Sequence, residues 1–153
     1  MNSLVAVLFA TIAATAAPMP SPQALPTIRV RAPRATLTLQ VANTEQERET
    51  GLMSVTHLPA HTGMLFVFPH DAPVQFWMKD TLVPLDMVFC SRNGIVGRVS
   101  SNVPVVPADT PDEQIPRRNG TGKYVLELPA GEASRDGIIP GVHLSVQSQT
   151  SSQ

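Results

Sequence analysis

Apolar and polar residues alternate along most of the chain, which predicts strands rather than helices. Leu37, Leu39 and Val41 alternate with polar residues, as expected for a strand with one buried face. Continuous apolar runs at 63–69 and 85–90 predict strands that are buried on both faces. Shorter alternating segments predict the remaining strands, about eight in all, at 28–31, 73–78, 95–100, 124–128 and 142–146.

One short helix is predicted, over residues 45–50. Thr44 and Glu47 have the T-x-x-E spacing of a capping box, and Gly51 is placed to end the helix. Prolines are frequent in 101–122, which predicts a long surface loop because proline cannot donate a ladder hydrogen bond.

Turn signals separate the predicted strands. Asn93-Gly94 lies between two apolar runs and favours a tight hairpin, because both residues tolerate positive φ. Long crossover helices, which parallel sheets need, are missing from the pattern. The fold class is therefore predicted to be mainly β: a small antiparallel barrel-like or sandwich domain with one short helix.

Composition narrows the class of protein. The chain has 153 residues, of which 42% are hydrophobic and 15% are charged, so it can bury a core and wholesale disorder is excluded. The net charge of −1 gives no electrostatic case for nucleic acid as a partner. A single cysteine excludes an internal disulfide.

The chain divides into four segments. Residues 1–17 have the apolar core and small-x-small ending (Ala14-Thr15-Ala16) of a signal peptide, although no Lys or Arg precedes the core. A Pro/Arg-rich linker at 18–34, one β-rich domain at 35–147 and a polar tail at 148–153 follow. The protein is thus predicted to be exported, periplasmic or secreted, with no stable membrane span after signal cleavage. A retained N-terminal anchor is the alternative.

Five blocks, in order along the chain, carry a family resemblance: "ERETGLM", "GMLFVF", "FWMKDTLVPLDMVF", "NGIV" and "YVLELPAG". Together they resemble the family known as domain of unknown function 192 (DUF192), over roughly 37–146. The resemblance implies a small, β-rich, often exported domain without an established activity. Asp80 stands where the family usually has Asn, Ser91 where an acidic residue is frequent, and "GVHL" where Gly-Asp is more usual.

The segment from Gln75 to Phe89 places charged side chains inside an apolar run. In the strand predicted at 85–90 neither face looks solvent-exposed, so Asp86 is expected to be buried and to need a cation or several donors. Lys79, Arg48 or backbone amides of the 79–81 corner could supply them. A ligand-binding pocket is predicted here, formed by Trp77, Lys79, Asp80, Thr81, Asp86 and Arg48.

Several interpretations of this segment stay open. The charges could simply stabilise a tight corner between two strands. The first functional prediction is binding of a small ligand or a cell-envelope component. The alternatives are a hydrolase or lyase with Asp86 as general base and Lys79 as electrostatic stabiliser, and a structural or protein-interaction module.

Copper binding by methionine and histidine is a further alternative, because thioether and imidazole ligands suit that metal. The residues concerned are Met53, Met64, Met78, Met87, His57, His61 and His70. They lack a Met-x-x-Met or His-x-His cluster, and methionine also fills gaps in apolar cores. No cofactor or metal is therefore predicted, and Cys90 is predicted to be an inert core residue.

Overall fold

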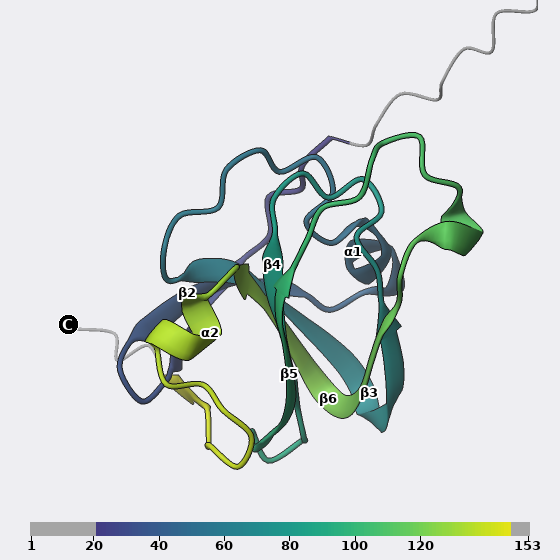
Figure 1. Cartoon of the computed structure of the whole chain (residues 1–153). Helices are drawn as coiled ribbons and strands as arrows, with labels where there is room; N and C mark the ends of the chain where they lie inside the picture. The colour runs from purple at the N-terminus through teal and green to yellow at the C-terminus, as the bar shows by residue number, and fades with distance from the viewer. Residues whose placement is uncertain (1–20, 148–153) are drawn as a thin grey trace, which may run out of the picture.

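A computed structural model describes residues 21–147 of the protein, and a single curled sheet dominates it (Figure 1). Seven strands lie side by side in the order β5-β4-β6-β3-β2-β1-β7. Their bounds are β1 Thr27–Arg31, β2 Thr36–Ala42, β3 Thr62–Phe76, β4 Leu85–Cys90, β5 Val96–Val103, β6 Arg118–Pro129 and β7 Ser145–Gln147. Two short helices, α1 Glu45–Thr50 and α2 Glu132–Arg135, and the 3₁₀ turn η1 Asp112–Gln114 complete the described chain. The mainly β, barrel-like prediction is confirmed.

One strand pair departs from the predicted antiparallel arrangement. β2 and β3 are parallel, with Thr38 opposite Thr62 and Ala42 opposite Phe66. The connection between them, residues 43–61, contains α1 and is long enough to return the chain to the same end of the sheet. The remaining pairs are antiparallel.

β3 is one long strand where two were predicted. Pro69 and Pro73 suggested a break, but the register with β6 shifts between Val67 and Ala72 and resumes beyond it. Such an irregularity lets a strand tolerate residues that cannot donate ladder hydrogen bonds. The described residues therefore hold seven strands rather than about eight.

The long predicted loop is shorter than residues 101–122. β5 continues to Val103 and β6 begins at Arg118, so only the proline-containing part between them lies outside the sheet. The domain also starts earlier than residue 35, because β1 pairs with both β2 and β7. The predicted signal peptide at 1–17 and the tail at 148–153 lie outside the described residues.

The helix signals in the sequence are confirmed. The side chain of Thr44 accepts a hydrogen bond from the amide of Glu47, and the Glu47 carboxylate accepts one from the amide of Thr44. Gly51 ends α1 with a φ of 47°, a conformation that favours glycine. Among the described residues, no helix has the length and hydropathy needed to cross a bilayer.

The curled sheet closes on itself at one end. The amide of Val96, after the β4–β5 turn, donates to the carbonyl of Val142 at 2.8 Å, and the amide of Leu144 donates to the carbonyl of Gly94 at 2.9 Å. We call this contact between residues 94–96 and 141–144 the seam. The seam joins the chain just before β5 to the chain just before β7, which are the two edge strands of the sheet. It therefore curls the sheet into a half-barrel.

Each face of the sheet has its own apolar cluster. One contains Leu37, Leu39, Leu65 and Leu126, together with residues of α2 and the seam. The other is covered by the chain after α1 and the chain after β3, and it is built from Met64, Phe66, Met78, Leu85, Met87, Phe89 and Val125. β4 contributes to both clusters and every one of its residues is buried, as its continuous apolar run predicted.

Candidate functional site

Four of the six predicted site residues line one narrow pocket. Arg48, Trp77, Lys79 and Thr81 contribute to its walls, and Glu127 of β6 contributes from the sheet. The pocket has a volume of about 30 Å³. We call it the Glu127 pocket.

Glu127 is a carboxyl group in an apolar environment. Met64 of β3 and Met87 of β4 are its direct neighbours across the sheet, and only 5% of Glu127 is exposed. Among the described residues, none forms a hydrogen bond or an ion pair with the carboxyl group of Glu127. Burial raises the pKa of Glu127 from 4.5 to about 8, because the ionised form loses its hydration. A carboxyl group of this kind is protonated at neutral pH and can donate a hydrogen bond.

Arg48 lies at the wall of the Glu127 pocket and is held by backbone carbonyls. Its Nη1 donates to the carbonyl oxygen of Asn43 at 2.7 Å and to that of Val67 at 2.9 Å. The guanidinium also lies 5.1 Å from the ring centroid of Phe68. These contacts fix a positive charge between α1 and β3 without neutralising it.

Lys79 and Trp77 form the other wall. The Nζ of Lys79 lies 2.6 Å from a carboxylate oxygen of Asp112 in η1. Trp77 has two cations near its ring, Lys79 at 5.2 Å and Arg117 at 3.9 Å from the centroid. The contact with Arg117 therefore joins the indole to the loop between β5 and β6.

Asp80 faces a second hollow instead. This hollow, of about 180 Å³, is shared with Lys79 and Thr81 and extends to the loop before β6. Asp80 has a φ of 50°, and its carbonyl accepts a hydrogen bond from the amide of Ser54 at 2.9 Å. The 79–81 corner thus separates two concave sites, and Asp80 belongs to only one of them.

Asp86 is not part of either hollow. Its carboxylate is fully buried and accepts one hydrogen bond from the amide of Asn102 at 2.7 Å and another from the amide of Ala133 at 2.9 Å. The expected partners Lys79 and Arg48 do not contact it. Asp86 therefore joins β4 to β5 and to α2. A general base needs a free oxygen near a substrate, which this arrangement does not offer.

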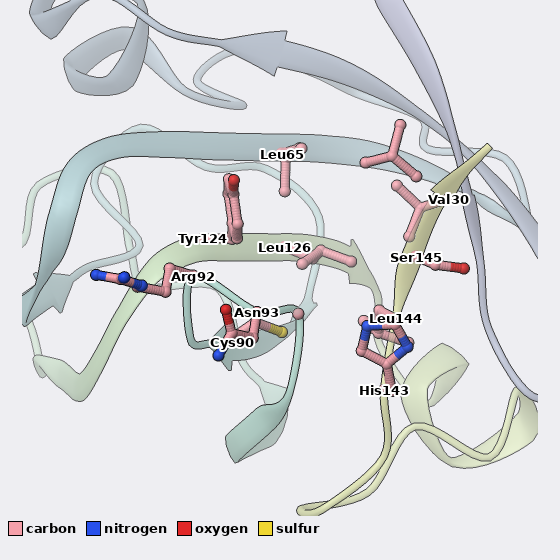
Figure 2. Close-up of a pocket in the computed structure, with 12 residues that line it drawn as sticks. Val30, Leu65, Cys90, Arg92, Asn93, Tyr124, Leu126, His143, Leu144 and Ser145 are labelled. Carbon is pink, nitrogen blue, oxygen red and sulfur yellow. The ribbon is translucent and has the colours of Figure 1, made fainter. Parts of the chain in front are cut away.

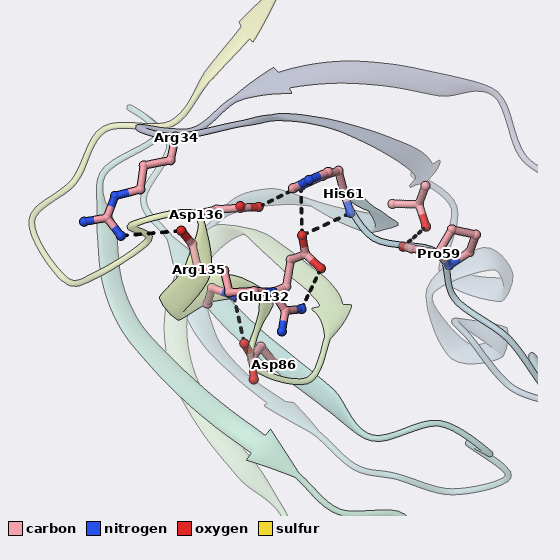
Figure 3. Close-up of polar contacts among 9 residues, drawn as sticks. Arg34, Pro59, His61, Asp86, Glu132, Arg135 and Asp136 are labelled. Atoms are coloured by element: carbon pink, nitrogen blue, oxygen red, sulfur yellow. Dashed lines mark hydrogen bonds and ion pairs between the residues drawn. The ribbon is translucent and has the colours of Figure 1, made fainter.

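A second acidic network lies beside Asp86 (Figure 3). Glu132 is fully buried and Asp136 nearly so, and Nδ1 of His61 lies 2.8 Å from Glu132 and 3.2 Å from Asp136. The Nη2 of Arg135 contacts the other oxygen of Glu132 at 3.0 Å. His61, Glu132 and Asp136 could supply one nitrogen and two oxygens to a metal ion, since these atoms lie within 4.8 Å of one another. In the described structure the imidazole contacts both carboxylates.

Comparison with known proteins gives the family. The family model for DUF192, described as Uncharacterized ACR, matches residues 27–146. The chain belongs to the DUF192 family. A search of curated proteins finds no match.

Two solved structures resemble this DUF192 domain. A protein from Sinorhizobium meliloti 1021, provisionally described as a transcription regulator, is 33% identical, with a TM-score of 0.71 over 82% of this chain and 98% of that one. A protein of unknown function from Novosphingobium aromaticivorans DSM 12444 is 30% identical, with a TM-score of 0.63 over 78% of this chain and 83% of that one.

The methionine and histidine residues considered for copper do not assemble in this DUF192 domain as one ligand set. Met64, Met78 and Met87 are buried in an apolar cluster, where they pack with phenylalanine and leucine. The imidazole of His61 contacts carboxylates rather than thioethers. Met53 lies apart from that imidazole, on the wall of the Glu127 pocket.

Sequence reasoning missed Glu127. The residue lies in "YVLEL", where it shares a face with Val125 and alternates with Leu126 and Leu128. A glutamate between two leucines in a central strand resembles the solvent face of a half-buried strand. The continuous burial of residues 125–128 overrides that pattern. A useful signal was available, because the block belongs to the family resemblance and Glu127 is its only charged residue.

Proposed function

We propose that this DUF192 domain binds a small molecule through an anionic oxygen group, such as a carboxylate, in the Glu127 pocket. The observation that carries the proposal is the carboxyl group of Glu127, which is 5% exposed and lies in a pocket with Arg48 and Lys79 on its walls. Glu49 also lines this pocket, and Lys79 contacts Asp112 on its outer side. A carboxyl group that burial keeps neutral, on the wall of a concave site, is a candidate for a group that binds a ligand.

The size of the pocket limits what enters it. A volume of about 30 Å³ accommodates little more than one or two water-sized groups. A ligand would therefore insert only its head group, and the rest would lie against Trp77 at the surface. A protonated Glu127 donates a hydrogen bond to the head group, and the two cations favour its negative charge.

This proposal predicts a pH dependence. Once Glu127 ionises, above a pH of about 8, it repels an anion and loses its donor hydrogen. The affinity for a simple carboxylate should therefore fall about tenfold per pH unit above that value, as for binding to one protonation state of a single group. In a Glu127→Gln variant the affinity should not change over the same range.

Trp77 is the only tryptophan and lines the pocket, so its fluorescence reports on this site. Acetate, propionate and benzoate would be titrated into the protein at pH 6–9, with acetamide as the uncharged comparison. Lys79→Gln should weaken binding several-fold, and the exposed Glu113→Gln serves as a matched control. The absence of a saturable response to every carboxylate, or an unchanged response in Glu127→Ala, would contradict the proposal.

The predicted signal peptide supports an extracytoplasmic location for this activity. Mass spectrometry of protein recovered from the cell envelope should give a chain that begins near residue 18. Recovery of a chain that retains residues 1–17 in the cytoplasmic fraction would rule out this location.

A further inference from the structure

A second concave site lies at the seam, away from the Glu127 pocket. It is a cavity of about 270 Å³ between β7 and the strands β4 and β6 (Figure 2). Apolar side chains form much of its lining, from Val30, Leu65, Leu126, Leu144 and Val146. We call it the β7 cavity.

The shape of the β7 cavity follows from incomplete closure of the sheet. The backbone bonds of the seam hold residues 94–96 against 141–144, whereas β7 pairs only with β1 in the described chain. In the described chain β5 and β7 are the two edge strands and do not pair, so beyond the seam the edges of the curled sheet stay apart. Ends of barrels that are left open in this way are common positions for ligand sites.

The polar groups around the cavity are cationic or neutral. Arg92, Asn93, Tyr124, His143 and Ser145 contribute to the lining, and none of the described lining residues is acidic. The side chains of Arg92 and His143 lie on opposite sides of the cavity in Figure 2.

Arg92 has a guanidinium that no described residue neutralises. The carboxylate of Asp71 accepts a hydrogen bond from the backbone amide of Arg92 at 2.9 Å, not from its guanidinium. Lys123 adds a further cation, because its Nζ lies 5.8 Å from the ring centroid of Tyr124. At the other side, Val146 exposes 63% of its surface beside the cavity. An apolar hollow with an unpaired arginine at its rim is complementary to a molecule that has both an apolar body and a negative charge.

We propose that the β7 cavity binds an amphipathic anion, with an apolar chain between the two edges of the sheet and a carboxylate at Arg92. The volume of about 270 Å³ is slightly below that of common small-molecule sites, about 300–1,000 Å³, so the chain is short. This site is separate from the Glu127 pocket, and the two share no lining residue.

Octanoate is the probe, measured by isothermal titration calorimetry on the full mature protein at pH 7. Octanoate should bind, and octanol and octylammonium should bind at least fivefold more weakly. Arg92→Gln should weaken octanoate binding at least fivefold, while Arg98→Gln, an exposed arginine outside the cavity, should leave it unchanged. Val146→Asp should weaken it similarly, with the exposed Val105→Asp as its control.

Three outcomes would overturn the proposal. One is equal binding of octanoate by Arg92→Gln and Arg98→Gln, and another is equal binding of octylammonium. The third is binding that appears only in a chain ending at residue 147, which would make the protein's own C-terminal residues the occupant. Octanoate that enters the Glu127 pocket instead would change Trp77 fluorescence and would be lost in Glu127→Ala. The two proposals can therefore fail separately.

Discussion

The stability of the protein should depend on pH through Glu127. Its pKa is about 8 in the folded protein, against 4.5 when the side chain is hydrated. Between these two pH values the folded state holds a proton that the unfolded state has released. The unfolded state therefore binds fewer protons, and the free energy of unfolding falls as the pH rises.

The size of this effect follows from the same two values. Each pH unit between them lowers the free energy of unfolding by about 1.4 kcal/mol, and the full contribution is about 5 kcal/mol. It is present in full below pH 4.5, is lost progressively, and is gone above pH 8. Glu127→Gln keeps the shape and the neutral state of the side chain but cannot ionise. The variant should therefore become more stable than the wild type, by several kcal/mol at pH 8–9.

Urea unfolding followed by Trp77 fluorescence at pH 5, 6, 7, 8 and 9 measures the difference between the two proteins. Subtraction removes the contribution of the other titrating groups, because they are common to both. The exposed Glu113→Gln is the matched control and should show no such trend. A difference between wild type and Glu127→Gln that stays constant from pH 5 to pH 9 would refute the argument that Glu127 is desolvated.

Two further predictions concern buried polar and thiol groups. Asp86→Asn replaces one acceptor oxygen with a donor opposite the amide of Asn102 or Ala133. The substitution should lower the free energy of unfolding by about 2–4 kcal/mol in urea titrations. An unchanged unfolding midpoint would contradict a structural role for Asp86. Burial raises the pKa of the Cys90 thiol to about 12. Iodoacetamide at pH 8 should therefore modify the folded protein about a thousandfold more slowly than the urea-unfolded protein. Comparable rates would show that β4 opens readily.

Local signals in the sequence were sufficient to predict the individual strands and the helix α1, but not how the strands pair in the sheet. The T-x-x-E spacing of Thr44 and Glu47 identified α1, because a capping box involves residues only three positions apart. The parallel pairing of β2 and β3 was not predictable in this way. It depends on where the chain goes after α1, which no periodicity describes.

The candidate site was predictable only in part, for the same reason. The composition of "FWMKDT" was sufficient to identify Trp77, Lys79 and Thr81 as residues near a pocket. Asp86 was correctly expected to be buried, but its two donors lie 16 and 47 positions away. The environment of Glu127 is likewise set by the neighbouring strands β3 and β4. Partners this distant are fixed by tertiary structure alone.

The pairing of β1 with β7 determines when the sheet can finish folding. Val30 lies opposite Val146, near the two ends of the described chain, so the sheet cannot reach its final form until β7 has been synthesised. Pairings between such distant residues form slowly, because a long loop must close first. An incomplete chain lacks the strand that covers one edge of β1. If the protein is exported as proposed, this late pairing favours transfer across the membrane before the sheet is complete.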